Sequence, residues 1–154
     1  MNNLNELLGQ VGGEVLESLA FLLPVESGPP SSDAASMTAQ VAFHGPFDGL
    51  VRVRVPRDML AELASNMLGL EAGEAASGEQ QADALGELAN VICGNLLPKV
   101  AGAEAVFDVA PAQVVPSDAA GREPPCVSAS LAFDAGNVVL ELVVPGGVRV
   151  PATV

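Results

Sequence analysis

The residues best placed to do chemistry stand in the stretch DALGELANVICGNLL, residues 83–97. Asp83, Glu87 and Asn90 are spaced by four and three residues, so at about 100° per residue they share one face of a helix. Gly94 continues this row without a side chain and would let another molecule approach the backbone. Carboxylates attract cations, and an amide can accept a hydrogen bond from water while donating another. The row thus predicts a narrow polar strip that another molecule could approach closely.

A plainer interpretation of the same stretch stays open at this point. Every amphipathic helix has a polar face, where Glu and Asn are ordinary residues. Gly94 could equally let a strand of the same chain pack closely. In both interpretations the opposite face is buried, and it consists of Leu85, Leu88, Ala89, Ile92 and Leu96.

Composition excludes several classes of protein. The formal net charge is −13 and Lys99 is the only lysine, so we expect no nucleic-acid binding and no attraction to anionic membranes. No apolar run has transmembrane length, and no basic residue precedes Arg52, which argues against a signal peptide. Cys93 and Cys126 each have apolar neighbours, which predicts buried thiols and a reducing cytoplasm. With His44 as the single histidine, we expect no metal site and no cofactor on this chain.

Hydrophobic periodicity divides the chain into three helices and five strands. Helices are predicted over 2–23, 57–69 and 83–97, and strands over 37–45, 49–56, 105–115, 126–134 and 137–145. Pro24 and Pro98 should end the first and third helices, because proline cannot donate the helical hydrogen bond. In the second strand Arg52 and Arg54 alternate with valines, which predicts one wet face and one buried face.

Two parts of the chain resemble each other in the same order. Residues 13–24 are similar to 86–98, and both segments are predicted to be helical. Residues 41–56 are similar to 130–145, and both are predicted hairpins that end in Val-Pro. Each half of the chain thus has a helix followed by a hairpin. This pattern favours an internal helix–hairpin pseudo-repeat. We therefore predict a single domain over 1–154 of class α+β, a two-layer sandwich with a mainly antiparallel sheet and the two long helices on one face.

The run D-x-x-x-E-x-x-N-x-x-x-G-N, from Asp83 through Glu87, Asn90 and Gly94 to Asn95, resembles the signature of the CheC/CheX/FliY phosphatases of bacterial chemotaxis. The order of the predicted elements is also similar to that family over almost the whole chain. In the first helix Glu17 stands where the signature has its Asn, and Phe21 stands where it has its Gly. A single signature makes the chain most similar to the CheX type.

The resemblance implies a function and a partner. The implied activity is dephosphorylation of the aspartyl phosphate of a CheY-type response regulator, with Asn90 inserted to position the attacking water and Glu87 docking to a regulator lysine. Asp83 would orient Glu87 or form part of the docking surface, and Gly94 would leave room for the partner. Mg²⁺ is implied on the regulator and not on this chain. The resemblance further implies a homodimer that forms through its sheets.

Two other functions compete with this one. A non-catalytic adaptor could bind a response regulator or a motor component through the same helix face without hydrolysing anything. The Glu87 and Asn90 pair favours the enzyme over the adaptor. A small-molecule binding domain is weaker, because no other convergent polar set is present in the sequence.

Overall fold

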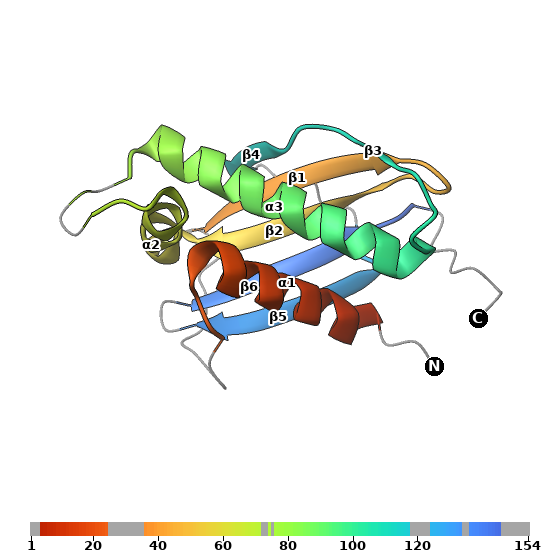
Figure 1. Cartoon of the computed structure of the whole chain (residues 1–154), viewed down its shortest axis with the longest axis horizontal. Coiled ribbons are helices and arrows are strands. Elements are labelled where there is room, and N and C mark those ends of the chain that lie inside the picture. Colours follow the sequence, from red (N-terminus) through yellow and green to blue (C-terminus); the bar gives the residue numbers. More distant parts are fainter. Residues whose placement is uncertain are drawn as a thin grey trace.

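An antiparallel sheet covered on one face by helices forms the part of the chain that the structure describes (Figure 1). This structure is a computed structural model that describes residues 4–24, 36–71, 74, 76–117, 124–133 and 136–145. Its elements are α1 (Leu4–Ala20), β1 (Ser36–His44), β2 (Gly49–Pro56), α2 (Arg57–Leu68), α3 (Gly78–Ala101), β3 (Asp108–Val109), β4 (Gln113–Pro116), β5 (Val127–Phe133) and β6 (Gly136–Val143). The strand order is β3-β1-β2-β6-β5, and β4 pairs with β1 beside β3.

The sheet is built from two hairpins joined side by side. β1 pairs with β2, β5 pairs with β6, and the two hairpins meet along β2 and β6 at the centre. α1 packs on β5 and β6, whereas α3 packs on β1 and β2 (Figure 1). Each long helix therefore covers the hairpin of the other helix–hairpin unit. This arrangement confirms the predicted α+β two-layer fold with both long helices on one face.

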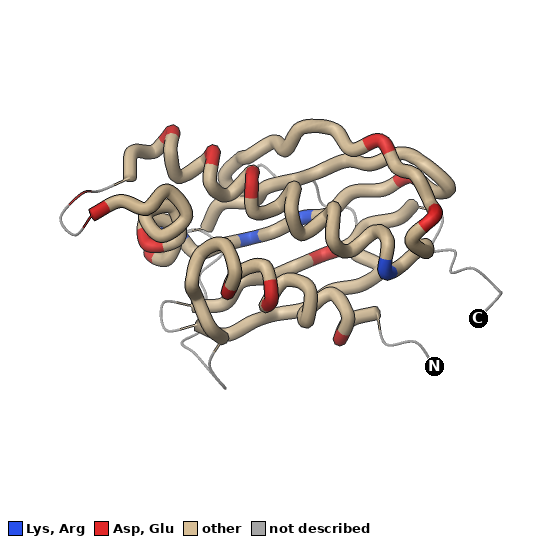
Figure 2. Tube along the Cα trace, viewed as in Figure 1, with Lys and Arg blue, Asp and Glu red and all other residues tan. Residues whose placement is uncertain are grey.

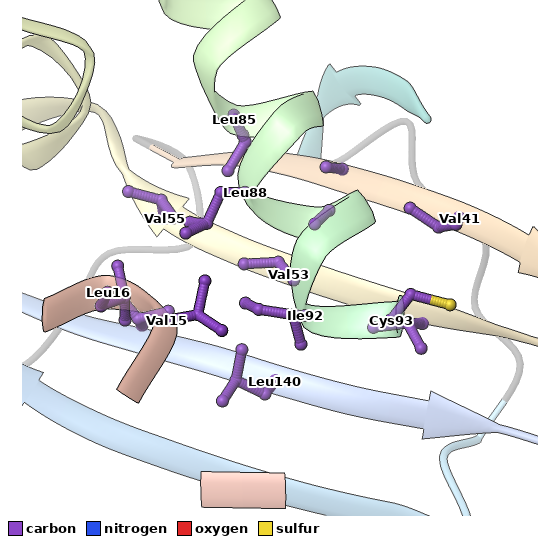
Figure 3. Packing of buried hydrophobic residues seen from close by; sticks show 14 of the residues in the cluster. Val15, Leu16, Val41, Val53, Val55, Leu85, Leu88, Ile92, Cys93 and Leu140 are labelled. Carbon is purple, nitrogen blue, oxygen red and sulfur yellow. The ribbon is translucent and has the colours of Figure 1, made fainter. Parts of the chain in front are cut away.

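The core lies between the two long helices and the sheet. Leu88 and Ile92 of α3 are completely buried and point toward the sheet, Leu88 beside Val55 and Ile92 near Val53 (Figure 3). α1 approaches β6 very closely, since a Cβ on Gly12 would collide with the side chain of Leu140. The buried face of α3 is thus fixed against the sheet, and its opposite face is set by the helical repeat.

The first helix is shorter than predicted. It ends at Ala20, and Phe21 adopts a left-handed conformation with φ 55°. The Phe21 amide donates to the Glu17 carbonyl at 3.1 Å, which is the hydrogen bond of an αL helix cap. Phe21 therefore lies beyond the helix and is 72% exposed. The strand that follows begins at Ser36, one residue before the predicted start at 37.

The third helix is longer than predicted at both ends. Ser77 and Gln80 form a capping box at its start, so the helix begins at Gly78. The prediction that Pro98 limits the helix was wrong, because the helix continues to Ala101. Leu97 and Val100 are buried on either side of Pro98, and their packing holds the last turn despite the missing donor.

Two strand predictions also need correction. The strand predicted over 105–115 is instead the two short strands β3 and β4, separated around Pro111. The predicted wet face of β2 is wrong for Arg52, which is only 5% exposed. Its Nε donates to Glu141 Oε1 at 2.9 Å, and the two residues face each other across β2 and β6. A buried guanidinium needs such a partner.

Candidate functional site

The polar row of the sequence lies on the outward face of α3. Asp83 and Glu87 are exposed and Asn90 is partly exposed, whereas Leu85 and Leu88 on the other face are buried. The side chains of Asp83, Glu87 and Asn90 make no hydrogen bond or ion pair with the residues that the structure describes. Their polar groups are consequently available to another molecule.

These three side chains line an open groove between α3 and the segment that leads into β4. The groove has a volume of about 430 Å³. Its lining residues are Ala82, Asp83, Gly86, Glu87, Asn90, Pro111, Ala112 and Val114. One wall is therefore acidic and polar, and the other is apolar. The structure brings Asp83, Glu87 and Asn90 together at one groove, whereas Gly94 lies further along α3 and outside its lining.

The apolar wall was not predicted from the sequence. Pro111, Ala112 and Val114 were placed within a long strand, and nothing in their pattern connects them to α3. Gly86 on the floor offered the only signal, since it is an unexplained glycine inside a helix. A Cβ on Gly86 would lie 3.5 Å from Ala112 Cβ and 3.7 Å from Val114 Cγ2. A side chain longer than one carbon would therefore begin to fill the groove.

Gly94 has no packing role among the described residues. A Cβ built on Gly94 would find no heavy atom within 4 Å, apart from its chain neighbours and the nearby backbone of its own helix. The interpretation that Gly94 lets a strand of this chain pack closely is therefore wrong for the described structure. The position leaves an exposed stretch of bare helix one turn beyond Asn90.

Acidic residues continue the row toward the start of α3. Glu79, Asp83 and Glu87 follow one another at intervals of four residues, and all three are exposed. Figure 2 shows this line of acidic positions along α3, with a basic position only near the far end of the helix. Like charges at this spacing destabilise a helix by about 0.2–0.5 kcal/mol per pair. A basic group placed beside the row would relieve this repulsion.

Among the described residues that line the groove beside Asn90, there is no Cys, Ser, Thr or Lys to act as a covalent nucleophile. Cys93 is fully buried on the sheet side of α3, and burial raises the pKa of its thiol to about 11. It therefore stays protonated and unreactive near neutral pH. Cys126 was expected to be buried but is exposed, and its thiol donates to the Val144 carbonyl at 3.1 Å. Within the described ranges, no three His, Cys, Asp or Glu side chains gather as a metal site.

Comparisons with known proteins agree with this architecture. The family model described as "Chemotaxis phosphatase CheX" matches residues 37–133, which include α3 and the groove. The chain resembles the crystal structure of CheX from Desulfovibrio desulfuricans with a TM-score of 0.71 and 18% identity, over 93% of this chain and 99% of that chain. The CheX structure from Vibrio vulnificus gives a TM-score of 0.69 and 18% identity, over 93% and 97% of the two chains.

A third similar structure contains a partner. It is the complex of CheX with CheY, BeF3 and Mg²⁺ from Borrelia burgdorferi, with a TM-score of 0.65 and 16% identity. The match covers 90% of this chain and 96% of that chain. A search of curated protein sequences found no relative of this chain. At these identities the structural likeness establishes the fold.

The fold and the matched model together define a class and then a family. The class is that of the chemotaxis phosphatases related to CheC, CheX and FliY, whose fold this chain shares. The match to the family model spans more than half of the chain, so the chain belongs to the CheX family. Among the helices within the described ranges, none is long and apolar enough to cross a membrane.

Proposed function

We propose that this protein dephosphorylates the aspartyl phosphate of a CheY-type response regulator. Asn90 positions the attacking water, and Glu87 contacts a lysine of the regulator. Asp83 and Gly94 belong to the docking surface, the first as a charge and the second as open space. The reaction takes place in the cytoplasm, where such regulators are phosphorylated.

This proposal rests mainly on the exposure of Glu87 and Asn90 and on their lack of partners within the described residues. They stand one turn apart on an exposed helix face, open to a groove and unengaged by the described part of their own chain. Membership of the CheX family supports the activity, and the CheY-bound CheX of Borrelia burgdorferi supports the class of partner. The acidic row on α3 supports a partner whose contacting surface is basic.

The chemistry demands little from this chain. An aspartyl phosphate is an acyl phosphate and already reactive, and Mg²⁺ on the regulator neutralises charge that develops on the phosphoryl group. What this protein can add is a water molecule held in line with the phosphorus of the regulator's phosphoryl group. The Asn90 amide suits this task, because its oxygen accepts from water while its NH₂ group donates elsewhere. No nucleophile, metal or cofactor of this chain takes part.

The test is a phosphate-release assay with purified CheY-type regulators from the same organism. Each regulator is phosphorylated with a small phosphodonor, and its decay is followed with and without this protein. Faster decay in proportion to the amount of protein supports the proposal. Binding without faster decay would instead favour the adaptor, in which the same helix face holds a regulator or motor component and hydrolyses nothing.

Replacing Gly94 with alanine should separate stability from function. The added methyl group meets open space and improves helix propensity, so the free energy of unfolding should rise by about 0.5–1 kcal/mol. The same methyl group should keep the regulator at a distance and raise KM by roughly threefold to tenfold. Thermal unfolding and the phosphate-release assay measure the two effects.

Gly78 provides the matched control for this experiment. It also faces open space, but it is the first residue of α3, at the far end of the helix from Gly94. Gly78→Ala should leave turnover unchanged. A Gly94→Ala variant that is more stable and equally active would show that the partner does not approach this part of the helix.

We also propose that the protein forms a homodimer through a sheet edge. β5 pairs with β6 and, within the described residues, with no other strand. Its sequence VSASLAF contains no charge and no proline to block pairing. Asn5 Oδ1 accepts from the Ser128 amide at 3.1 Å and so occupies the first outward donor of this edge. Light scattering should give twice the monomer mass, and a monomer at every concentration would contradict the proposal.

A further inference from the structure

The second wall of the groove has a different chemistry from the signature residues. Ala112 and Val114 are partly buried and present only carbon atoms, and exposed Pro111 extends this wall. Opposite them stand Glu87 and Asn90. An occupant that matches both walls must carry a polar or basic group on one side and an apolar group on the other.

The groove is kept open by small residues of this chain. Gly86 and Ala82 on the α3 side face Ala112 on the other. A Cβ on Gly86 would already stand in ordinary contact with Ala112 and Val114, so the two walls lie close together there, and an occupant must lie above this floor, in the open part of the groove. The apolar surface there gains stability when a partner covers it.

The charge of the lining indicates the kind of partner. Asp83 and Glu87 contribute two carboxylates, and no Lys or Arg is among the lining residues. A basic group that enters beside Glu87 would be attracted, and an acidic one would be repelled. The partner should therefore present a basic residue next to an apolar residue on one short segment.

We propose that Ala112 and Val114 form a specificity-determining contact for the response regulator. They accept an apolar side chain that lies beside the regulator lysine facing Glu87. This inference rests on the proposed function and names a second contact within the same site. Because the wall has no side chain able to orient water, it contributes to binding and to the choice of regulator, and not to the hydrolytic step.

Filling the groove from the apolar side tests this contact. Ala112→Leu places a larger side chain where the regulator residue should sit. The dissociation constant for a CheY-type regulator loaded with Mg²⁺ and beryllofluoride, a stable mimic of the phosphorylated state, should rise about tenfold. The kcat of the variant at saturating phosphorylated regulator should stay within about twofold of the wild-type value.

The control substitution is at the next residue along the chain, the first residue of β4. Gln113 is exposed and does not line the groove, so Gln113→Leu adds a similar apolar side chain elsewhere and should leave both constants unchanged. If Ala112→Leu does not fold, Val114→Thr keeps the shape of the wall and adds a hydroxyl group. That variant should raise the dissociation constant by about threefold.

The outcomes separate the two proposals. An unchanged dissociation constant in the folded Ala112→Leu protein, with normal turnover, would overturn the apolar contact alone. Wild-type protein that binds the loaded regulator but never accelerates decay would overturn the phosphatase, and the apolar contact would then be judged by the dissociation constants. Failure of the wild-type protein to bind any CheY-type regulator would overturn both.

Discussion

Replacing Asn90 with alanine should remove most of the acceleration of regulator dephosphorylation and leave the fold intact. Asn90 lies on the outward side of α3 and makes no side-chain hydrogen bond within the described structure, so the free energy of unfolding should change by no more than about 0.5 kcal/mol. An amide that orients the attacking water acts mainly in the transition state. We therefore expect kcat to fall by roughly 100-fold, with a smaller change in KM.

Two further variants sharpen this test. Asn90→Asp keeps the size of the side chain but replaces the NH₂ donor with a charged oxygen, so it should be as inactive as the alanine variant. Glu17→Ala changes the residue of α1 that corresponds to Asn90 in the first helix, and it should leave turnover nearly unchanged. If Asn90→Ala has a normal kcat, measured by the decay of the phosphorylated regulator, the polar row is only a solvent-exposed helix face without a catalytic role.

The orientation of α3 could be predicted because the helical repeat alone determines it. Leu88 and Ile92 had to face the sheet once the helix was recognised, and this placed Glu87 and Asn90 outside. The hairpins followed from alternation in the same way. The ends of α3 were less predictable, since burial of Val100 outweighs the effect of Pro98, and burial depends on tertiary contacts.

The apolar half of the site was beyond prediction for a related reason. Ala112 and Val114 lie more than twenty residues from Asn90 along the chain, and they reach α3 only because β4 pairs with β1 under that helix. Burial of Arg52 likewise depends on Glu141 from the other hairpin. Local periodicity carries no information about such distant pairs, whereas the signature on α3 is entirely local.

Replacing Glu87 with alanine should weaken docking more than it slows chemistry. Glu87 is exposed at the groove and has no cation of its own chain beside it within the described residues. Removing it deletes the charge that faces the regulator lysine, so KM should rise about tenfold while kcat changes less. Glu62→Ala is the matched control, because it removes one exposed carboxylate from α2, outside the groove.

The salt dependence of this effect identifies how Glu87 acts. If the carboxylate mainly attracts the regulator from a distance, the gap in KM between wild type and Glu87→Ala should shrink as ionic strength rises toward about 0.5 M. If the ion pair forms inside a groove from which docking has expelled water, part of the gap should persist. We expect a persistent part, because the apolar wall opposite Glu87 shields the contact from solvent. Equal effects of Glu87→Ala and Glu62→Ala at every salt concentration would show that only net charge matters, and would contradict a specific contact at Glu87.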